Sequence, residues 1–245
     1  MRPPGRWLTL SRTVYILTPV PTHQAGSRER MIQATETLLR ESGLSGAGIK
    51  QLVTRSGAPV GSVYHFFPGG KTQIVTETLR VHSAKVARLF EHAFRDAAVP
   101  LPARLRALFR MAASAFEAAG ADKSCAIAGV TLDLRASDRS LRQVCDASFT
   151  QWVDEIASHL PWPDVETRRS FATMVVLSLE GAFILARAEK AGDAFTTAGD
   201  WLARLAQSTL PVPTGESHAS SPAAHHRPAR RRRRVSPSGP RTKEA

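Results

Sequence analysis

A short helical segment bounded by glycines occupies residues 56–71, which read SGAPVGSVYHFFPGGK. Gly57 separates it from residues 49–56, whose apolar side chains are spaced as one face of a short helix. A Pro-Gly-Gly run ends the segment, because proline and glycine both disfavour helix. Two short helices on either side of a glycine turn have the dimensions of a helix-turn-helix, and the spacing predicts this motif here.

The second helix of the motif presents small or hydrogen-bonding groups at its N-terminal and outer positions. These positions hold Val60, Gly61, Ser62, Tyr64 and His65. Such groups suit insertion into a DNA major groove, which is about 12 Å wide. Lys71 opens the next helix, where its ammonium group and nearby backbone N–H groups would meet a phosphate.

Helical apolar spacing continues across residues 27–210. Ser27 is expected to cap the first helix, which stops at Gly43, and Pro59 to start the third. Further helices are predicted at 71–95, 102–119, 124–135, 138–160, 164–190 and 193–209. No strand-length alternation of β-branched residues competes, so the predicted fold class is all-α. It comprises an N-terminal three-helix helix-turn-helix domain and a C-terminal helical bundle.

The formal net charge of +12 over 245 residues is unevenly distributed. Residues 1–26 hold three arginines and no acid, residues 27–80 seven basic and four acidic residues, and residues 211–245 eight and two. Residues 81–210 balance fifteen against fifteen. We expect a disordered extension, a DNA-binding domain, a regulatory ligand-binding and dimerisation domain, and a disordered basic tail, in that order. The Arg230–Arg234 run is either a solvated tail or a source of non-specific phosphate contacts.

Several classes of protein are disfavoured by the sequence. Gly70-Lys71-Thr72 lacks the glycine that a phosphate-binding loop needs five positions before Gly70, where His65 stands. The two cysteines, Cys125 and Cys145, have no nearby histidine pair for zinc. The apolar run at 171–186 is interrupted by Glu180, which indicates a buried helix rather than a membrane span. We expect no catalytic site, cofactor, metal or signal peptide, and a cytoplasmic location.

Three segments carry a specific resemblance. Arg28–Ile32, Gly57–Pro68 and Gly70-Lys71 resemble the DNA-binding domain of the tetracycline-repressor (TetR) family over about 55 residues, with turn, tyrosine, aromatic-proline and lysine at the family's spacing. Residues 124–130, 141–145 and 179–182 weakly resemble the regulatory domain of the branch similar to the lincomycin-resistance repressor. The resemblance implies a dimeric, all-helical repressor whose C-terminal domain binds a small molecule and releases DNA.

The resemblance also implies roles for individual residues. Val60, Gly61 and Ser62 would face base edges, Tyr64 and Lys71 would touch phosphates, and Lys50 would reach a base or the backbone. Two positions depart from the family pattern: Phe66 stands where many members have histidine, and Ala47-Gly48 where many have threonine or serine. One phosphate donor and one hydroxyl cap are therefore missing.

The regulatory half is rich in large apolar residues at helical spacings. Most are expected to form the core, and several to line a cavity for an apolar or aromatic ligand. The candidates for ligand contact are Phe90, Phe109, Phe116, Cys125, Trp152, Phe171 and Met174.

The helix predicted at 164–190 is apolar on more than one face, which indicates a second subunit as partner. The predicted dimer interface consists of Gly181, Ala182, Ile184, Leu185, Trp201 and Leu205. A two-fold dimer places its recognition helices about 34–36 Å apart, which matches a palindromic operator.

These features together predict a homodimeric, DNA-binding transcriptional regulator, a repressor that a small apolar or aromatic molecule releases. Two alternatives stay open. The basic tails favour an architectural protein that binds DNA irrespective of sequence, whereas Phe66 and Gly48 favour a helical small-molecule-binding protein or enzyme without DNA contact.

Overall fold

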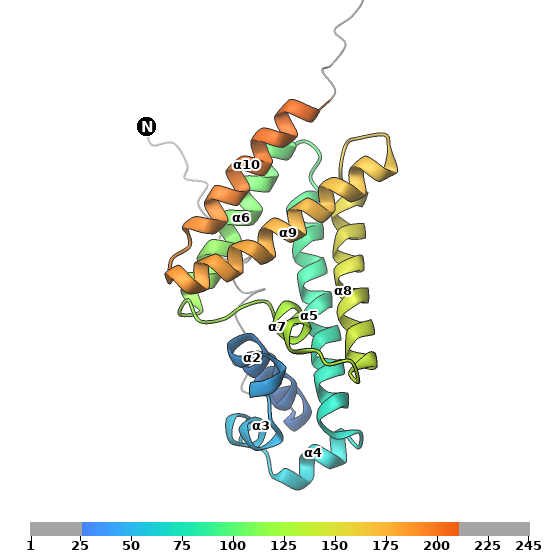
Figure 1. Cartoon of the computed structure of the whole chain (residues 1–245), viewed down its shortest axis with the longest axis vertical. Coiled ribbons are helices and arrows are strands. Elements are labelled where there is room, and N and C mark those ends of the chain that lie inside the picture. The colour runs from blue at the N-terminus through green and yellow to red at the C-terminus, as the bar shows by residue number, and fades with distance from the viewer. Residues whose placement is uncertain (1–25, 211–245) are drawn as a thin grey trace, which may run out of the picture. The chain divides into compact units, whose positions relative to one another are not determined.

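The computed structural model describes residues 26–210, and no strand occurs in this range (Figure 1). The helices are α2 (Ser27–Gly46), α3 (Ile49–Ser56), α4 (Val60–Phe66), α5 (Gly70–Phe94), α6 (Leu101–Ala118), α7 (Ala126–Asp133), α8 (Arg139–Ser158), α9 (Val165–Glu189) and α10 (Asp193–Thr209). The all-α prediction is confirmed. The predicted extension and basic tail lie outside the described residues, apart from Gly26.

The first helix differs from its prediction at both ends. Gly26 precedes it without a side-chain cap, and Ser27 is its first residue, so the predicted Ser27 cap is wrong. The hydroxyl of Ser27 instead accepts a hydrogen bond from Arg30 at 3.0 Å. Gly43 stands where the helix was expected to stop and takes a φ of 64°, but a short helical piece continues to Gly46. The backbone kink at Gly43 brings the end of α2 against α7.

Helix α5 connects the two predicted domains. Its first half packs against α2 with Ile74, Val75 and Leu79 buried, and its second half buries Phe90 and Phe94. The boundary predicted at residue 80 therefore falls within a continuous helix. The described residues belong to one compact unit, so the division at residue 80 stays a prediction about function.

The C-terminal helices form the bundle around α5. Helix α8 runs alongside α5, where the Trp152 indole donates to the Ser83 carbonyl at 3.1 Å (Figure 1). Helix α10 packs closely on α6, since a Cβ at Gly199 would lie only 2.7 Å from the Phe109 Cβ. Helix α9 is long and apolar enough to cross a membrane by composition, and one of its faces packs against α8 and α10.

Candidate DNA-binding surface and ligand cavity

The helix-turn-helix consists of α3, a turn at Gly57 and α4. Gly57 has a φ of 64° and a ψ of 15°, a left-handed conformation that glycine adopts without steric cost, and its N–H donates to the Val53 carbonyl at 3.1 Å. Val63 and Phe67 are fully buried and fix α4 to the domain. The Arg28 guanidinium lies 5.5 Å from the centre of the Phe67 ring and packs over it.

The outer face of α4 collects five of the predicted DNA-binding residues. Val60 and Tyr64 are 54% and 55% exposed, large fractions for apolar and aromatic side chains. Gly61 and His65 are exposed beside them, and Ser62 is half-buried. Lys50 is also exposed on α3, so the structure leaves these residues accessible to a partner.

Lys71 has an additional structural role that the sequence did not reveal. It is half-buried, and its ammonium donates to the Leu44 carbonyl at the end of α2 at 2.6 Å. An ammonium group has three N–H donors, so two stay available for a phosphate. The same side chain therefore connects the start of α5 to α2.

A cavity of about 60 Å³ lies where the helix-turn-helix half meets the bundle. Its walls come from α2, α5, α6, α8, α9 and the segment before α7. It is lined by Glu36, Arg40, His82, Lys85, Val86, Leu89, Leu108, Ala112, Ser124, Cys125, Trp152, Leu179, Glu180 and Phe183.

Two of the seven predicted ligand contacts, Cys125 and Trp152, line this cavity. Four others are buried in the core without reaching it: Phe90, Phe109, Phe116 and Phe171. Met174 is 46% exposed on the outer face of α9, so its assignment to the cavity needs correction. The buried residues of α9 do not include Met174; they are Phe171, Ala172, Val175, Val176, Leu179, Ala182 and Ala186.

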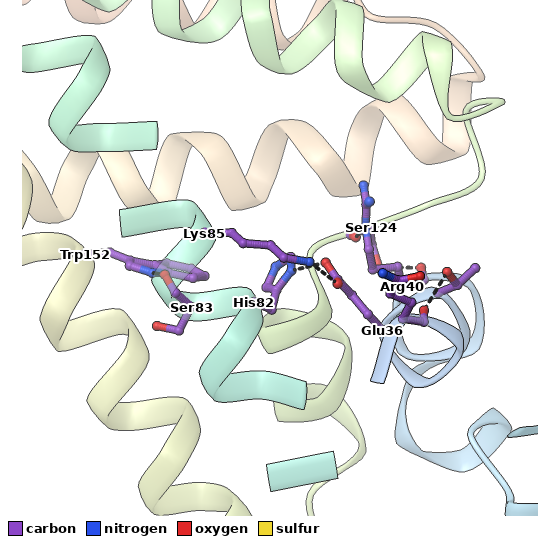
Figure 2. Close-up of polar contacts among 9 residues, drawn as sticks. Glu36, Arg40, His82, Ser83, Lys85, Ser124 and Trp152 are labelled. Atoms are coloured by element: carbon purple, nitrogen blue, oxygen red, sulfur yellow. Dashed lines mark hydrogen bonds and ion pairs between the residues drawn. The ribbon is translucent and has the colours of Figure 1, made fainter. Parts of the chain in front are cut away.

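One wall of the cavity is a charged cluster between α2 and α5. The Glu36 carboxylate contacts His82 Nδ1 at 3.0 Å and accepts a hydrogen bond from the Lys85 ammonium at 2.6 Å (Figure 2). Burial alone would raise the pKa of Glu36, but the hydrogen bonds and charges of His82 and Lys85 outweigh it and lower the pKa to about 2. Glu36 is therefore ionised at neutral pH and links α2 to α5.

A second contact joins α2 to the segment before α7. Arg40 donates through Nε to the Ser124 carbonyl at 3.0 Å, and the Ser124 N–H returns a hydrogen bond to the Arg40 carbonyl at 2.9 Å (Figure 2). The Ser124 hydroxyl donates to the same carbonyl at 3.0 Å. Burial lowers the pKa of Arg40, while the charge of Glu36 raises it. The C-terminal half of α2 is therefore bound to two walls of the cavity, to α5 through Glu36 and to the segment before α7 through Arg40.

The α9 side of the cavity holds a different acid. The Oε2 atom of Glu180 is buried and has no hydrogen-bond partner among residues 26–210. Burial raises the pKa of Glu180 to about 7, against a lowering by the Cys125 thiol. Burial and the Glu180 carboxyl in turn raise the pKa of Cys125. Glu36, His82 and Glu180 were not among the predicted ligand contacts, although the interruption of an apolar run by Glu180 was a visible signal.

The outer faces of α9 and α10 carry an exposed apolar patch. Its largest members are Met174, Leu177, Ile184, Leu185, Trp201 and Leu205, which are 43–64% exposed. Four of these belong to the predicted dimer interface, and Met174 and Leu177 were missed. Gly181 lies among them, with open space where its Cβ would be. Ala182 is only 3% exposed and packs inward, so its assignment to the interface needs correction.

Comparisons with known proteins agree with this geometry. The profile "Transcriptional regulator LmrA/YxaF-like, C-terminal domain" matches residues 102–200. The HTH-type transcriptional regulator YxaF of Bacillus subtilis (strain 168) is 28% identical over 176 residues, covering 69% of this chain and 89% of its own. The HTH-type transcriptional regulator Rv0196 of Mycobacterium tuberculosis (strain ATCC 25618 / H37Rv) is 30% identical over 174 residues, covering 67% and 86%.

The fold has solved counterparts as well. The crystal structure of regulatory protein TetR from Rhodobacter sphaeroides superposes with a TM-score of 0.66 at 22% identity, covering 73% of this chain and 97% of its own. The relatives are transcriptional regulators rather than enzymes, which confirms the non-enzymatic prediction. The chain belongs to the TetR family of DNA-binding transcriptional regulators, in its LmrA/YxaF-like branch.

Proposed function

We propose that this regulator is a homodimeric repressor that a small ligand releases from its operator. The observation that carries the proposal is that α2 belongs both to the DNA-binding motif and to the cavity wall. This helix packs against α3 and α4 and also contributes Glu36 and Arg40 to the cavity wall. A ligand that moves α2 therefore moves the DNA-binding motif with it. The predicted domains, 27–80 and 81–210, would be the two functional halves that α5 connects.

On the DNA side, the outer face of α4 inserts into the major groove. Val60, Gly61 and Ser62 face base edges, and Tyr64 and His65 lie beside them towards the backbone. Lys50 and the free N–H groups of Lys71 add contacts outside the recognition helix. The exposure of Val60 and Tyr64 supports this assignment, because a helix of a closed core would bury them.

The partner that covers the patch on α9 and α10 is a second copy of the chain. Contiguous exposed apolar side chains on two neighbouring helices mark an interaction surface. A two-fold axis through the patch pairs Leu177, Ile184 and Trp201 with the same residues of the partner subunit. The two α4 helices of such a dimer then bind the two halves of a palindromic operator. This binding takes place in the cytoplasm.

Ligand uptake requires the cavity to expand. Its volume is about 60 Å³, whereas a cavity that holds benzene measures about 150 Å³. An apolar or aromatic effector must therefore push α2 away from α5 or α9, against the contacts of Glu36 with His82 and Lys85. Coupling energies between effector and DNA sites are typically about 1–3 kcal/mol, or about 5–150-fold in affinity.

Binding of the full chain to its upstream intergenic DNA tests the proposal. At physiological salt with excess non-specific competitor, we expect a footprinted, roughly palindromic site bound by a dimer. Tyr64→Ala should weaken that binding about tenfold or more, because Tyr64 is exposed on the recognition helix. Val165→Ala, which truncates an equally exposed apolar residue on α9, is the matched control and should leave affinity unchanged.

Two results would contradict this assignment. One is normal operator affinity in Tyr64→Ala, measured with a dimer whose thermal stability is unchanged. The other is binding that disappears under competitor, which would favour the architectural alternative. A footprint without release by any bound compound would leave a DNA-binding regulator but remove the ligand-responsive part.

A further inference from the structure

The end of α2 and helix α7 approach each other through two glycines. Helix α7 packs against α2 (Figure 1). Gly43, at the kink of α2, has a φ of 64°, and a Cβ there would lie 3.2 Å from the Gly129 carbonyl oxygen of α7. A Cβ at Gly129 would in turn lie 3.0 Å from the Leu39 carbonyl oxygen. Both glycines therefore permit a close backbone contact between the two predicted domains, which larger residues would push apart.

Asp133, the last residue of α7, closes this contact. Its Oδ2 atom accepts a hydrogen bond from the Ser45 N–H at 2.8 Å. The same oxygen occupies the space beside Gly43, only 2.6 Å from where a Cβ would be. A carboxylate acceptor makes this hydrogen bond stronger than one between neutral groups. Asp133 therefore fixes the short helical piece that follows the kink of α2.

The same end of α2 also contacts two parts of the DNA-binding half. Lys71, at the start of α5, donates to the Leu44 carbonyl at 2.6 Å. Glu41 forms an ion pair with Arg55 of α3 at 2.7 Å. Helix α4 lies between α3 and α5 in the chain. A shift of the end of α2 would therefore be passed to the elements on both sides of the recognition helix.

The opposite end of α7 lies at the cavity. Cys125 lines the cavity and is the residue immediately before α7. Helix α7 has eight residues, which is a length of about 12 Å. Its Ala126, Ile127 and Val130 side chains are buried, which favours movement of the helix as one body. One short helix thus connects the wall of the cavity to the end of α2.

We propose that Asp133 is a positioning residue for operator binding, which acts through the end of α2 and does not itself contact DNA. A two-fold dimer binds both half-sites only if its recognition helices keep a fixed separation. Freedom at the end of α2 would widen the range of positions of α4 and lower specific affinity, because ordering a mobile surface opposes binding. This inference rests on the proposed function, and it names the contact through which α7 controls the DNA-binding motif.

Two substitutions of Asp133 in the full chain test the inference, with the footprinted upstream DNA as operator. Asp133→Ala removes the acceptor for the Ser45 N–H, and we expect operator affinity to fall about tenfold. Asp133→Asn removes the same charge but keeps an acceptor oxygen, so it should retain most of the affinity. Affinity for non-specific duplex DNA should be equal in the two variants, because they carry the same charge. Asp146→Ala, which truncates an exposed acid on α8, should leave specific binding unchanged.

Gly129→Ala disturbs the same contact without a change of charge. Its Cβ would press on the Leu39 carbonyl and displace α7 by a few tenths of an ångström, so operator affinity should fall severalfold. Should Asp133→Ala fail to fold, this variant decides alone: lowered affinity supports the inference, and unchanged affinity overturns it.

Two further results would overturn the inference. One is natural operator affinity in a folded Asp133→Ala dimer, and the other is an equal loss in Asp133→Ala and Asp133→Asn. Either would reject the inference alone, because the natural chain would still bind its operator. The absence of a footprint for the natural chain would reject the proposed function and the inference together.

Discussion

Glu36 and Glu180 are two glutamates of one cavity, and their surroundings give them opposite properties. Glu36 lies on α2 between His82 and Lys85, and its pKa is lowered to about 2. Glu180 lies on α9 without a charged partner, and burial raises its pKa to about 7. Because the residue type and the cavity are shared, the difference arises from the neighbours alone. The paired acid holds two helices together, and the unpaired acid is available to a ligand.

The unpaired acid has a thermodynamic cost that the paired one lacks. A carboxylate buried without a partner destabilises the folded state, and leucine or glutamine would fit the apolar run of α9 at lower cost. Helix α9 nevertheless carries Glu180 into a cavity otherwise closed by Leu179 and Phe183. Such local conflicts with packing are expected at functional sites. The energetic difference between the two acids can be measured directly.

Removing the paired acid should have the largest effect. Glu36→Gln keeps the shape of the side chain but leaves His82 and Lys85 without a carboxylate, and losing a hydrogen bond to a charged group costs about 1.5–3 kcal/mol. We expect that loss in the free energy of unfolding in urea at pH 7. Glu155→Gln, which breaks the half-buried pair between Glu155 on α8 and His159 just after this helix, should cost less than about 1 kcal/mol. Equal losses in the two variants would contradict the role of Glu36.

The pH dependence of the Glu36 contribution has a definite sign. Its folded pKa of about 2 is below its ordinary 4.5, so the stabilisation is complete above pH 4.5 and is lost as pH falls towards 2. The difference in stability between the natural chain and Glu36→Gln should therefore shrink as pH falls from 4.5 towards 2.

Removing Glu180, the unpaired acid, should have the opposite effect on stability, and this effect should appear over a different pH range. The folded pKa of Glu180, about 7, is above its ordinary 4.5, so the folded state loses stability as pH rises from 4.5 to 7. Glu180→Gln removes this penalty and should stabilise the chain by up to about 3 kcal/mol above pH 7. The gain should vanish below pH 4.5. A gain independent of pH would show that the carboxyl stays in one protonation state.

The helices were predictable because their signals are local. Apolar spacing and glycine positions lie within each segment, and the predicted 193–209 helix, for example, matches α10. The cavity was not predictable in the same way. Glu36 and His82 are 46 residues apart and meet only when α2 packs against α5. Sequence spacing gives the faces of each helix but not which faces meet across the fold.

In helix α9, the spacing of the apolar residues alone could have separated the outward face from the inward face. Residues 174, 177, 181, 184 and 185 recur at intervals of three and four, which is one helical face, and the structure exposes most of them. Ala182 belongs to the inward series with Val175 and Leu179. Assigning Met174 to the cavity and Ala182 to the interface therefore mixed the two faces. The role of Lys71 towards α2 depends on tertiary contact and had no sequence signal.

The smallest expected effect concerns the Cys125 side chain, which opposes the effect of burial on the pKa of Glu180. The Cys125 thiol lowers the pKa of Glu180 against the larger effect of burial. Cys125→Ala removes this weak donor, so the pH at which ionisation of Glu180 destabilises the folded state should move upward. The change in unfolding free energy should be below about 1 kcal/mol. Urea unfolding between pH 5 and 9 measures that midpoint, and Cys145→Ala, on α8 away from the cavity lining, is the control. A midpoint that moves downward, or moves equally in both variants, would mean that Cys125 does not hydrogen-bond to the carboxyl and that burial alone sets the pKa of Glu180.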